Sequence, residues 1–99
     1  MRGYKNLRSK MEKIKIKITN KLGLHLRPSS KLAQIASKYP CEILISRNQK
    51  KVNAKSVLGI TMLAAGQGSE IEIECNGVDE TQAVSAIKKL FETNFNEES

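Results

Sequence analysis

The chain has 99 residues, a length that suits one small domain with a single hydrophobic core. Hydrophobic residues make up 39% of it and charged residues 27%, as is typical of globular proteins, and no apolar run approaches the roughly 20 residues of a membrane-spanning helix. The net charge of +7 is uneven: residues 1–55 hold 15 Lys and Arg against 2 acids, and residues 56–99 hold 2 against 8. Basic surface suits a nucleic acid, an acidic protein or a phosphate-bearing site, and motifs must separate these classes.

The N-terminal segment is basic, but alternating Lys and Ile follow it instead of an apolar core and a cleavage site, so we expect no secretory signal. The two cysteines lie 34 positions apart and have no CxxC or His-rich neighbourhood, which argues against a disulfide framework and against a metal site. We therefore expect a cytoplasmic protein that uses no metal and no cofactor.

The first half of the chain predicts a strand, a helix and a hairpin. Alternation over residues 13–19 predicts a strand with its isoleucines inward and its lysines in water. Apolar residues at helical spacing predict a helix over about 26–38, which Pro40 ends. A second strand over 41–47 then turns at Asn48-Gln49 into a short third strand over 51–54.

The second half predicts a short helix, a strand and a longer helix. Ser56 is placed as the N-cap of the short helix, which ends in the turn at 66–68. Alternating Glu and Ile over 70–75 predict the fourth strand, and Asp79 with Gln82 form a capping-box-like start for the last helix.

This βαββαβα order, with every strand alternating apolar and polar residues, predicts an α+β open-faced sandwich. A four-stranded antiparallel sheet carries the helices packed on one face and exposes the other face to water. We expect residues 12–95 to form this domain. Residues 1–11 are expected to be a disordered basic extension, and residues 96–99 a frayed end.

The one histidine, His25, directly precedes the first predicted helix in Leu22-Gly-Leu-His-Leu-Arg-Pro28. A helix start presents unpaired N–H groups and a partial positive charge, which together stabilise a bound anion. A neutral imidazole is a nucleophile, and Arg27 offers a charged fork for phosphate oxygens. Gly23 allows a tight turn and Pro28 preorganises the first helical turn, so Gly23, Leu26 and Pro28 are predicted to seat a phosphate beside His25.

The short helix carries more apolar side chains than it can fully bury: Val57, Leu58, Ile60, Met62 and Leu63. Each of them is compatible with the core. Those exposed beside His25 would form a docking patch for protein partners, for which we select Val57, Leu58 and Ile60, with Arg27, Lys31 and Lys55 as a basic rim.

Two motifs, in order and spacing, resemble the signatures of the HPr family, the histidine-containing phosphocarriers of bacterial phosphotransferase systems. They are Gly23-Leu-His-Leu-Arg-Pro28 and Asn53-Ala-Lys-Ser-Val-Leu-Gly59, and the resemblance covers residues 13–91. It implies an HPr-like sandwich, phosphorylation of His25 on Nδ1 by enzyme I with phosphoenolpyruvate as the ultimate source, and transfer assisted by Arg27 to a IIA-type acceptor. Such a chain is a phosphoryl carrier and not an enzyme in its own right.

Three segments narrow the resemblance toward the nitrogen-related branch of the family, NPr: Ile18-Thr-Asn-Lys-Leu-Gly23, Met62-Leu-Ala-Ala-Gly66 and Leu90-Phe-Glu-Thr-Asn-Phe95. The chain departs from the family at Leu26 and Ser29, where Ala is frequent. In part of the family the serine matching Ser56 is phosphorylated by the HPr kinase/phosphorylase, which would add charge beside the docking surface. The N-cap role explains Ser56 equally well.

Two other functions are alternatives to phosphoryl transfer: RNA binding and regulatory protein binding. RNA-binding modules share βαββαβ orders, but they stack bases on aromatic side chains, and this chain has 2 Tyr, 2 Phe and no Trp, so we expect no nucleic-acid partner. Because no long apolar run is present, we expect no membrane partner either. A regulatory HPr paralogue that acts by phosphorylation-dependent protein binding is compatible with His25. The chain is expected to act as a monomer.

The cysteines are expected to be buried thiols. Cys41 and Cys75 share the inward phase of their strands, and the HPr-like strand order makes those two strands antiparallel neighbours. Their side chains are then close on the buried face, but a cytoplasmic setting argues against a disulfide between them.

Overall fold

The computed structural model describes residues 11–96. Its elements, in chain order, are β1 (Glu12–Lys17), α1 (Leu26–Ala36), β2 (Glu42–Arg47), β3 (Lys50–Asn53), α2 (Val57–Thr61), β4 (Glu70–Asn76), α3 (Glu80–Glu92) and the 3₁₀ helix η1 (Asn94–Asn96). The expectations for residues 1–10 and 97–99 lie outside the described residues. Within that part of the chain, no helix is long and apolar enough to cross a membrane.

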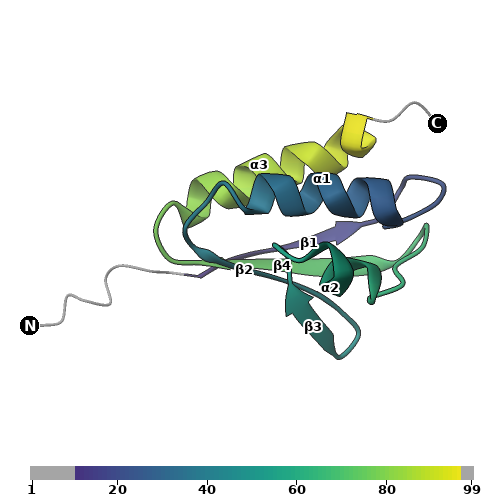
Figure 1. The fold of residues 1–99 in the computed structure, drawn as a ribbon, viewed down its shortest axis with the longest axis horizontal. Helices are drawn as coiled ribbons and strands as arrows, with labels where there is room; N and C mark the ends of the chain where they lie inside the picture. The colour runs from purple at the N-terminus through teal and green to yellow at the C-terminus, as the bar shows by residue number, and fades with distance from the viewer. Residues whose placement is uncertain (1–10, 97–99) are drawn as a thin grey trace, which may run out of the picture.

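The four strands form one antiparallel sheet in the order β1-β4-β2-β3. Helices α1 and α3 lie side by side over one face of the sheet (Figure 1). The short helix α2 lies beneath α1, away from the start of β1. This confirms the predicted βαββαβα open-faced sandwich. The predicted boundaries of the strands and of the two long helices agree with the observed ones to within two residues, whereas α2 ends at Thr61, well before the predicted turn at 66–68.

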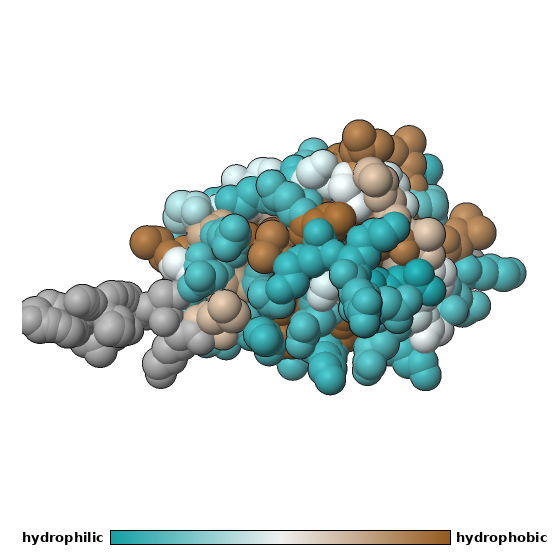
Figure 2. Space-filling model, turned by 90° about the horizontal axis from the view of Figure 1, so that it is seen from below, coloured by the Kyte–Doolittle hydropathy of each residue, from teal (hydrophilic) through white to brown (hydrophobic). Residues whose placement is uncertain are grey.

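The register of β1 on β4 follows from the alternation of both strands. On the helix-covered face isoleucines meet isoleucines, and on the open face each lysine of β1 is opposite a glutamate of β4: Lys13 with Glu74, Lys15 with Glu72 and Lys17 with Glu70. A slip of one residue would turn the isoleucines to water and the charges to the core, so the burial pattern fixes the pairing. Seen from below in Figure 2, hydrophilic side chains cover most of this open face.

The core lies between the sheet and the helices. Its fully buried large side chains come from every layer: Ile18, Leu32, Ile43, Ile45, Ile60, Ile71, Ile73, Ile87 and Phe95. Burial of one such side chain contributes about 1.5–3 kcal/mol. The predicted stripe on the last helix is confirmed, since Ala83, Ile87, Leu90 and Phe91 are all buried.

The start of α3 differs from the prediction. Asp79 adopts a left-handed conformation (φ 65°) and its side chain makes no capping hydrogen bond, so the Asp79–Gln82 capping box is wrong. A side-chain cap needs an extended N-cap backbone, which aims the carboxylate at the helix amides. Instead, Glu80 turns back and its Oε1 accepts a hydrogen bond of 2.8 Å from the Gly77 amide.

Candidate functional site

The segment between β1 and α1, residues 18–25, is referred to below as the His25 loop. Local hydrogen bonds fold it into a tight turn: the Gly23 amide donates to the Asn20 carbonyl (3.1 Å), and the His25 amide donates to the Gly23 carbonyl (3.0 Å). Asn20 is buried, and its Nδ2 donates to the same Gly23 carbonyl at 2.8 Å. The backbone that carries His25 is thus fixed before the helix begins.

A second segment, residues 62–69, braces the His25 loop from the side. The Leu24 amide donates to the Ala65 carbonyl at 2.8 Å. Three more hydrogen bonds join the two segments. The Gly68 amide donates to the Ile18 carbonyl, the Ile18 amide donates to the Ser69 carbonyl, and Gln67 Nε2 donates to the Thr19 carbonyl. The two segments are about 45 positions apart in sequence, so only the folded state brings them together.

Gly23 is required where these two segments meet. Its φ of +70° lies in the left-handed region, and a Cβ built there would clash with the Ala65 carbonyl and lie 2.6 Å from the Gly66 Cα. Both neighbours are backbone and cannot move aside cheaply. This confirms the expectation that a glycine lets the chain turn tightly before the histidine.

His25 is the N-cap residue of α1, with an extended backbone (φ −81°, ψ −171°) and no capping hydrogen bond from its side chain. Its carbonyl accepts from the Ser29 amide at 3.0 Å. By helix geometry the amides of Leu26 and Arg27 have no intrahelical acceptor, and Pro28 has no N–H. The ring is half-buried and its Nε2 atom is buried.

The surroundings of His25 favour an anion. The first turn of α1 contains no acidic residue, and the exposed Arg27 adds a permanent positive charge to the helix dipole. Ser29, one of the departures from the family pattern, is fully buried, and its Oγ donates to the Leu24 carbonyl at 3.0 Å. This hydroxyl ties the first turn of α1 to the loop that precedes it.

The predicted docking residues divide into exposed and buried ones. Leu26 and Leu58 are 67% and 71% exposed, and Val57 is half-buried. Ile60 is fully buried in the core, so its selection as a docking residue is wrong. The two residues lie on different faces of the five-residue helix α2, and Leu58 is exposed to solvent.

Two further apolar side chains are exposed: Leu22 at 71%, which is not among the candidates predicted from the sequence, and Met62 at 58%, which is among those candidates but is not selected as a docking residue. A leucine in a turn directly before Gly23, outside any periodic pattern, was the available signal for Leu22. We call the exposed Leu22, Leu26, Leu58 and Met62 the apolar patch. In Figure 2 several hydrophobic groups gather at the upper right of the visible face.

The two lysines of the predicted rim make internal hydrogen bonds. Lys31 Nζ donates to the Phe95 carbonyl at 2.6 Å, which ties α1 to the end of the described chain. Lys55 Nζ donates to the Tyr39 carbonyl at 2.7 Å. Each ammonium therefore has a structural role, and only its remaining N–H donors can face a partner.

Ser56 is the N-cap of α2, as predicted. Its backbone is extended (φ −110°, ψ 115°), and its Oγ accepts a hydrogen bond of 3.0 Å from the Gly59 amide. The side chain is half-buried. The capping role is thus established, whereas modification of the hydroxyl stays a prediction.

The cysteines lie at the far end of the sheet from His25. Both are buried free thiols, Ile43 of β2 is opposite Cys75 in the register, and Cys41 precedes β2 by one residue. Burial raises the pKa of Cys75 to about 12, and the adjacent Cys41 contributes to the shift. Burial also raises the pKa of Cys41. No group of three or more His, Cys, Asp and Glu within residues 11–96 could hold a metal ion.

Comparison with known proteins settles the family. Residues 12–93 match the family model described as the PTS HPr component phosphorylation site. The chain belongs to the HPr family. Its HPr relative from Neisseria meningitidis is 45% identical over 87 residues, which cover 88% of this chain and 98% of the relative.

A second HPr-family relative bears on the branch of the family. The NPr phosphocarrier of Klebsiella oxytoca is 39% identical over 84 residues, or 84% of this chain and 93% of the relative. Among solved structures, an HPr of Thermoanaerobacter tengcongensis superposes with a TM-score of 0.85 at 41% identity and covers 89% of this chain and 99% of its own. HPr proteins are phosphocarriers of the phosphotransferase system, and membership of the family implies interaction with components of that system such as enzyme I and IIA proteins.

Proposed function

We propose that this HPr-family chain accepts a phosphoryl group on Nδ1 of His25 from phospho-enzyme I and passes it to a IIA-type acceptor in a sugar or nitrogen-related phosphotransferase system. The observation that carries the proposal is the placement of His25: it is the N-cap of α1, beside the anion-favouring helix end, and its Nε2 atom is buried, which favours Nδ1 as the nucleophile.

The chemistry needs little beyond position and charge. The Nδ1 lone pair attacks phosphorus, an N–P bond forms, and the bond from phosphorus to the donor's leaving group breaks with its electron pair. The amides of Leu26 and Arg27 then donate to phosphoryl oxygens, and the Arg27 guanidinium neutralises charge on them. Transfer to the acceptor reverses these steps at Nδ1.

Partners of this site are proposed to have a complementary surface. The apolar patch would bury leucine and methionine side chains against them, and acidic groups on the partner would meet Arg27 and the remaining donors of Lys31. Such surfaces suit brief encounters, as a carrier that must release each partner requires. We place this exchange in the cytoplasm.

Ser56 is proposed as a second, regulatory phosphorylation site for an HPr kinase/phosphorylase. Its hydroxyl lies two residues before the exposed Leu58 of the apolar patch. A phosphate there would add about two negative charges beside an apolar docking surface, which opposes binding of an acidic partner.

The test is the intact mass of the chain after incubation with enzyme I and phosphoenolpyruvate. We expect the mass of one phosphoryl group to be added and to be lost in acid, as for a phosphohistidine. The His25→Ala variant should gain no mass while keeping the circular dichroism spectrum of the parent, because a half-buried N-cap contributes little to the core. Normal labelling of the alanine variant would end the assignment to His25.

A further inference from the structure

Two cations of the β2–β3 hairpin reach the end of α2. Arg47, the last residue of β2, donates from Nη1 to the Leu63 carbonyl at 3.2 Å, and Lys50, the first of β3, lies with Nζ 3.5 Å from the Met62 carbonyl. Met62 is the C-cap of α2 and Leu63 follows it, so both carbonyls lie just beyond the negative end of the helix dipole, which favours a cation there. The Arg47 contact is the shorter one and comes from a half-buried side chain.

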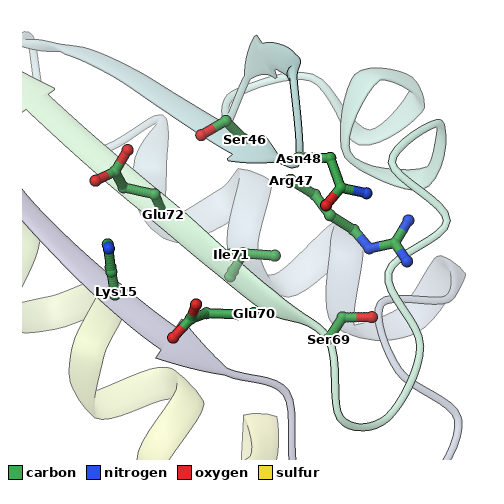
Figure 3. Close-up of a pocket in the computed structure, with 8 residues that line it drawn as sticks. All are labelled: Lys15, Ser46, Arg47, Asn48, Ser69, Glu70, Ile71 and Glu72. Carbon is green, nitrogen blue, oxygen red and sulfur yellow. The ribbon is translucent and has the colours of Figure 1, made fainter.

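Figure 3 shows the direction of the Arg47 side chain. The side chain extends from the end of β2 away from the open face of the sheet, toward the coil that leads into β4 at Ser69. That coil is the 62–69 segment, which braces the His25 loop. Arg47 therefore holds the segment at the end where it leaves α2.

A continuous set of contacts joins Arg47 to the histidine. Arg47 fixes Leu63; two residues later the Ala65 carbonyl accepts from the Leu24 amide at 2.8 Å; and Leu24 directly precedes His25. At the same place a Cβ on Gly23 would lie 2.6 Å from the Gly66 Cα, so the two segments are too close for any side chain between them.

We propose that Arg47 is a positioning residue for His25. It has no direct contact with the phosphoryl group; by anchoring Leu63 it keeps the Ala65 carbonyl where it holds the Leu24 amide, and this fixes the direction of the imidazole at the start of α1. The inference rests on the proposed phosphoryl transfer, since it concerns the geometry of the same site.

A positioning role differs measurably from a docking role. A cation that attracts partners raises the KM for phospho-enzyme I when it is removed, and leaves turnover at saturation unchanged. A residue that orients the nucleophile lowers turnover at saturation, with KM nearly unchanged, because small misplacements reduce the fraction of productive encounters.

The experiment compares Arg47→Met with Lys51→Met. Lys51 lies on the same hairpin and is paired with Glu74 at 3.0 Å on the open face, so its loss removes an equal charge away from the 62–69 segment. Arg47→Lys serves as the rescue variant, since an ammonium keeps a donor for the Leu63 carbonyl. Hydrogen exchange of the Leu24 amide reports the brace, and exchange of the Ile73 amide in the middle of the sheet reports the global fold.

We expect Arg47→Met to accelerate Leu24 exchange about tenfold with Ile73 unchanged, and to lower saturated phosphoryl acceptance about fivefold at constant KM. Lys51→Met should resemble the parent, and Arg47→Lys should recover most of the loss. Equal behaviour of the two methionine variants, or a change in KM alone, overturns the positioning role. Failure of the parent chain itself to be labelled overturns the proposed function instead, and the two failures are therefore distinct.

Discussion

The two long helices of this protein begin at opposite ends of the sheet and use their positive ends differently. At α3 the protein supplies its own anion: Glu80 occupies the first turn, is nearly buried, and accepts from the Gly77 amide at 2.8 Å. At α1 the first turn has no acid, the cap residue is His25, and an arginine follows it. An acidic side chain of the chain itself thus lies at the positive end of α3, whereas the positive end of α1 has none, which fits the phosphoryl site proposed there.

The largest expected difference between the two ends is chemical reactivity of the cysteines at the α3 end. At pH 8 the folded protein should hold about a thousandfold less Cys75 thiolate than the unfolded chain, because its pKa is raised from 9.0 to about 12. Native maleimide labelling should therefore be negligible, and denaturation without reductant should expose two thiols.

The same shift sets a pH dependence of stability. Between pH 9 and 12 the unfolded chain releases the Cys75 proton that the folded protein retains, so the free energy of unfolding should fall as pH rises through this window. Urea unfolding of Cys75→Ala should lose this alkaline decline. Rapid labelling of either cysteine in the native protein would contradict their inward orientation.

The α1 end should be sensitive to one glycine and tolerant of another. Gly23→Ala adds a Cβ to a left-handed residue that is in contact with the backbone of 65–66, and should cost about 2–4 kcal/mol of unfolding free energy. Gly68→Ala is the matched control: its φ is +90°, but a Cβ there meets nothing within 4 Å, so only the backbone term of about 1 kcal/mol applies. Thermal and urea unfolding measure the loss of unfolding free energy in both variants. Equal losses would show that the close approach of Gly23 to the backbone of 65–66 does not affect stability.

The smallest effect tests the comparison directly by giving α1 the acid that α3 has. Leu26→Glu should stabilise the helix by about 0.3–1 kcal/mol and lower the rate of phosphoryl acceptance about tenfold, since the new carboxylate repels the incoming group. Leu26→Gln separates charge from the loss of an exposed leucine, because it removes the apolar side chain without adding charge. If both variants slow equally, the helix end does not act through its charge.

Periodic patterns determined how much of the fold was predictable. Alternating Ile with Lys in β1 and Ile with Glu in β4 predicted both strands and the buried face, because successive side chains of a strand point to opposite faces of the sheet. The start of α3 was missed because an Asp three residues before a Gln predicts a cap only if the backbone is extended, and Asp79 is left-handed.

The candidate site was predictable where its residues are neighbours in sequence. His25, Arg27 and Gly23 lie within five positions, and a helix start gives that short motif its chemistry. Ile60 was assigned wrongly because crowded apolar residues on a five-residue helix leave no period to separate core from surface. The contact of Arg47 with Leu63 depends on how a hairpin packs on a loop, and local sequence does not encode it.

The row of lysines on β1 also limits how this sheet can grow. β1 lies at the edge of the sheet, with its second edge unpaired among the described strands. If another copy of β1 added to that edge, in-register pairing would place lysines beside lysines, where β4 now supplies glutamates. Like charges directly opposite are destabilising, so the residues that complete the sheet from within also discourage its extension into strand-to-strand aggregates.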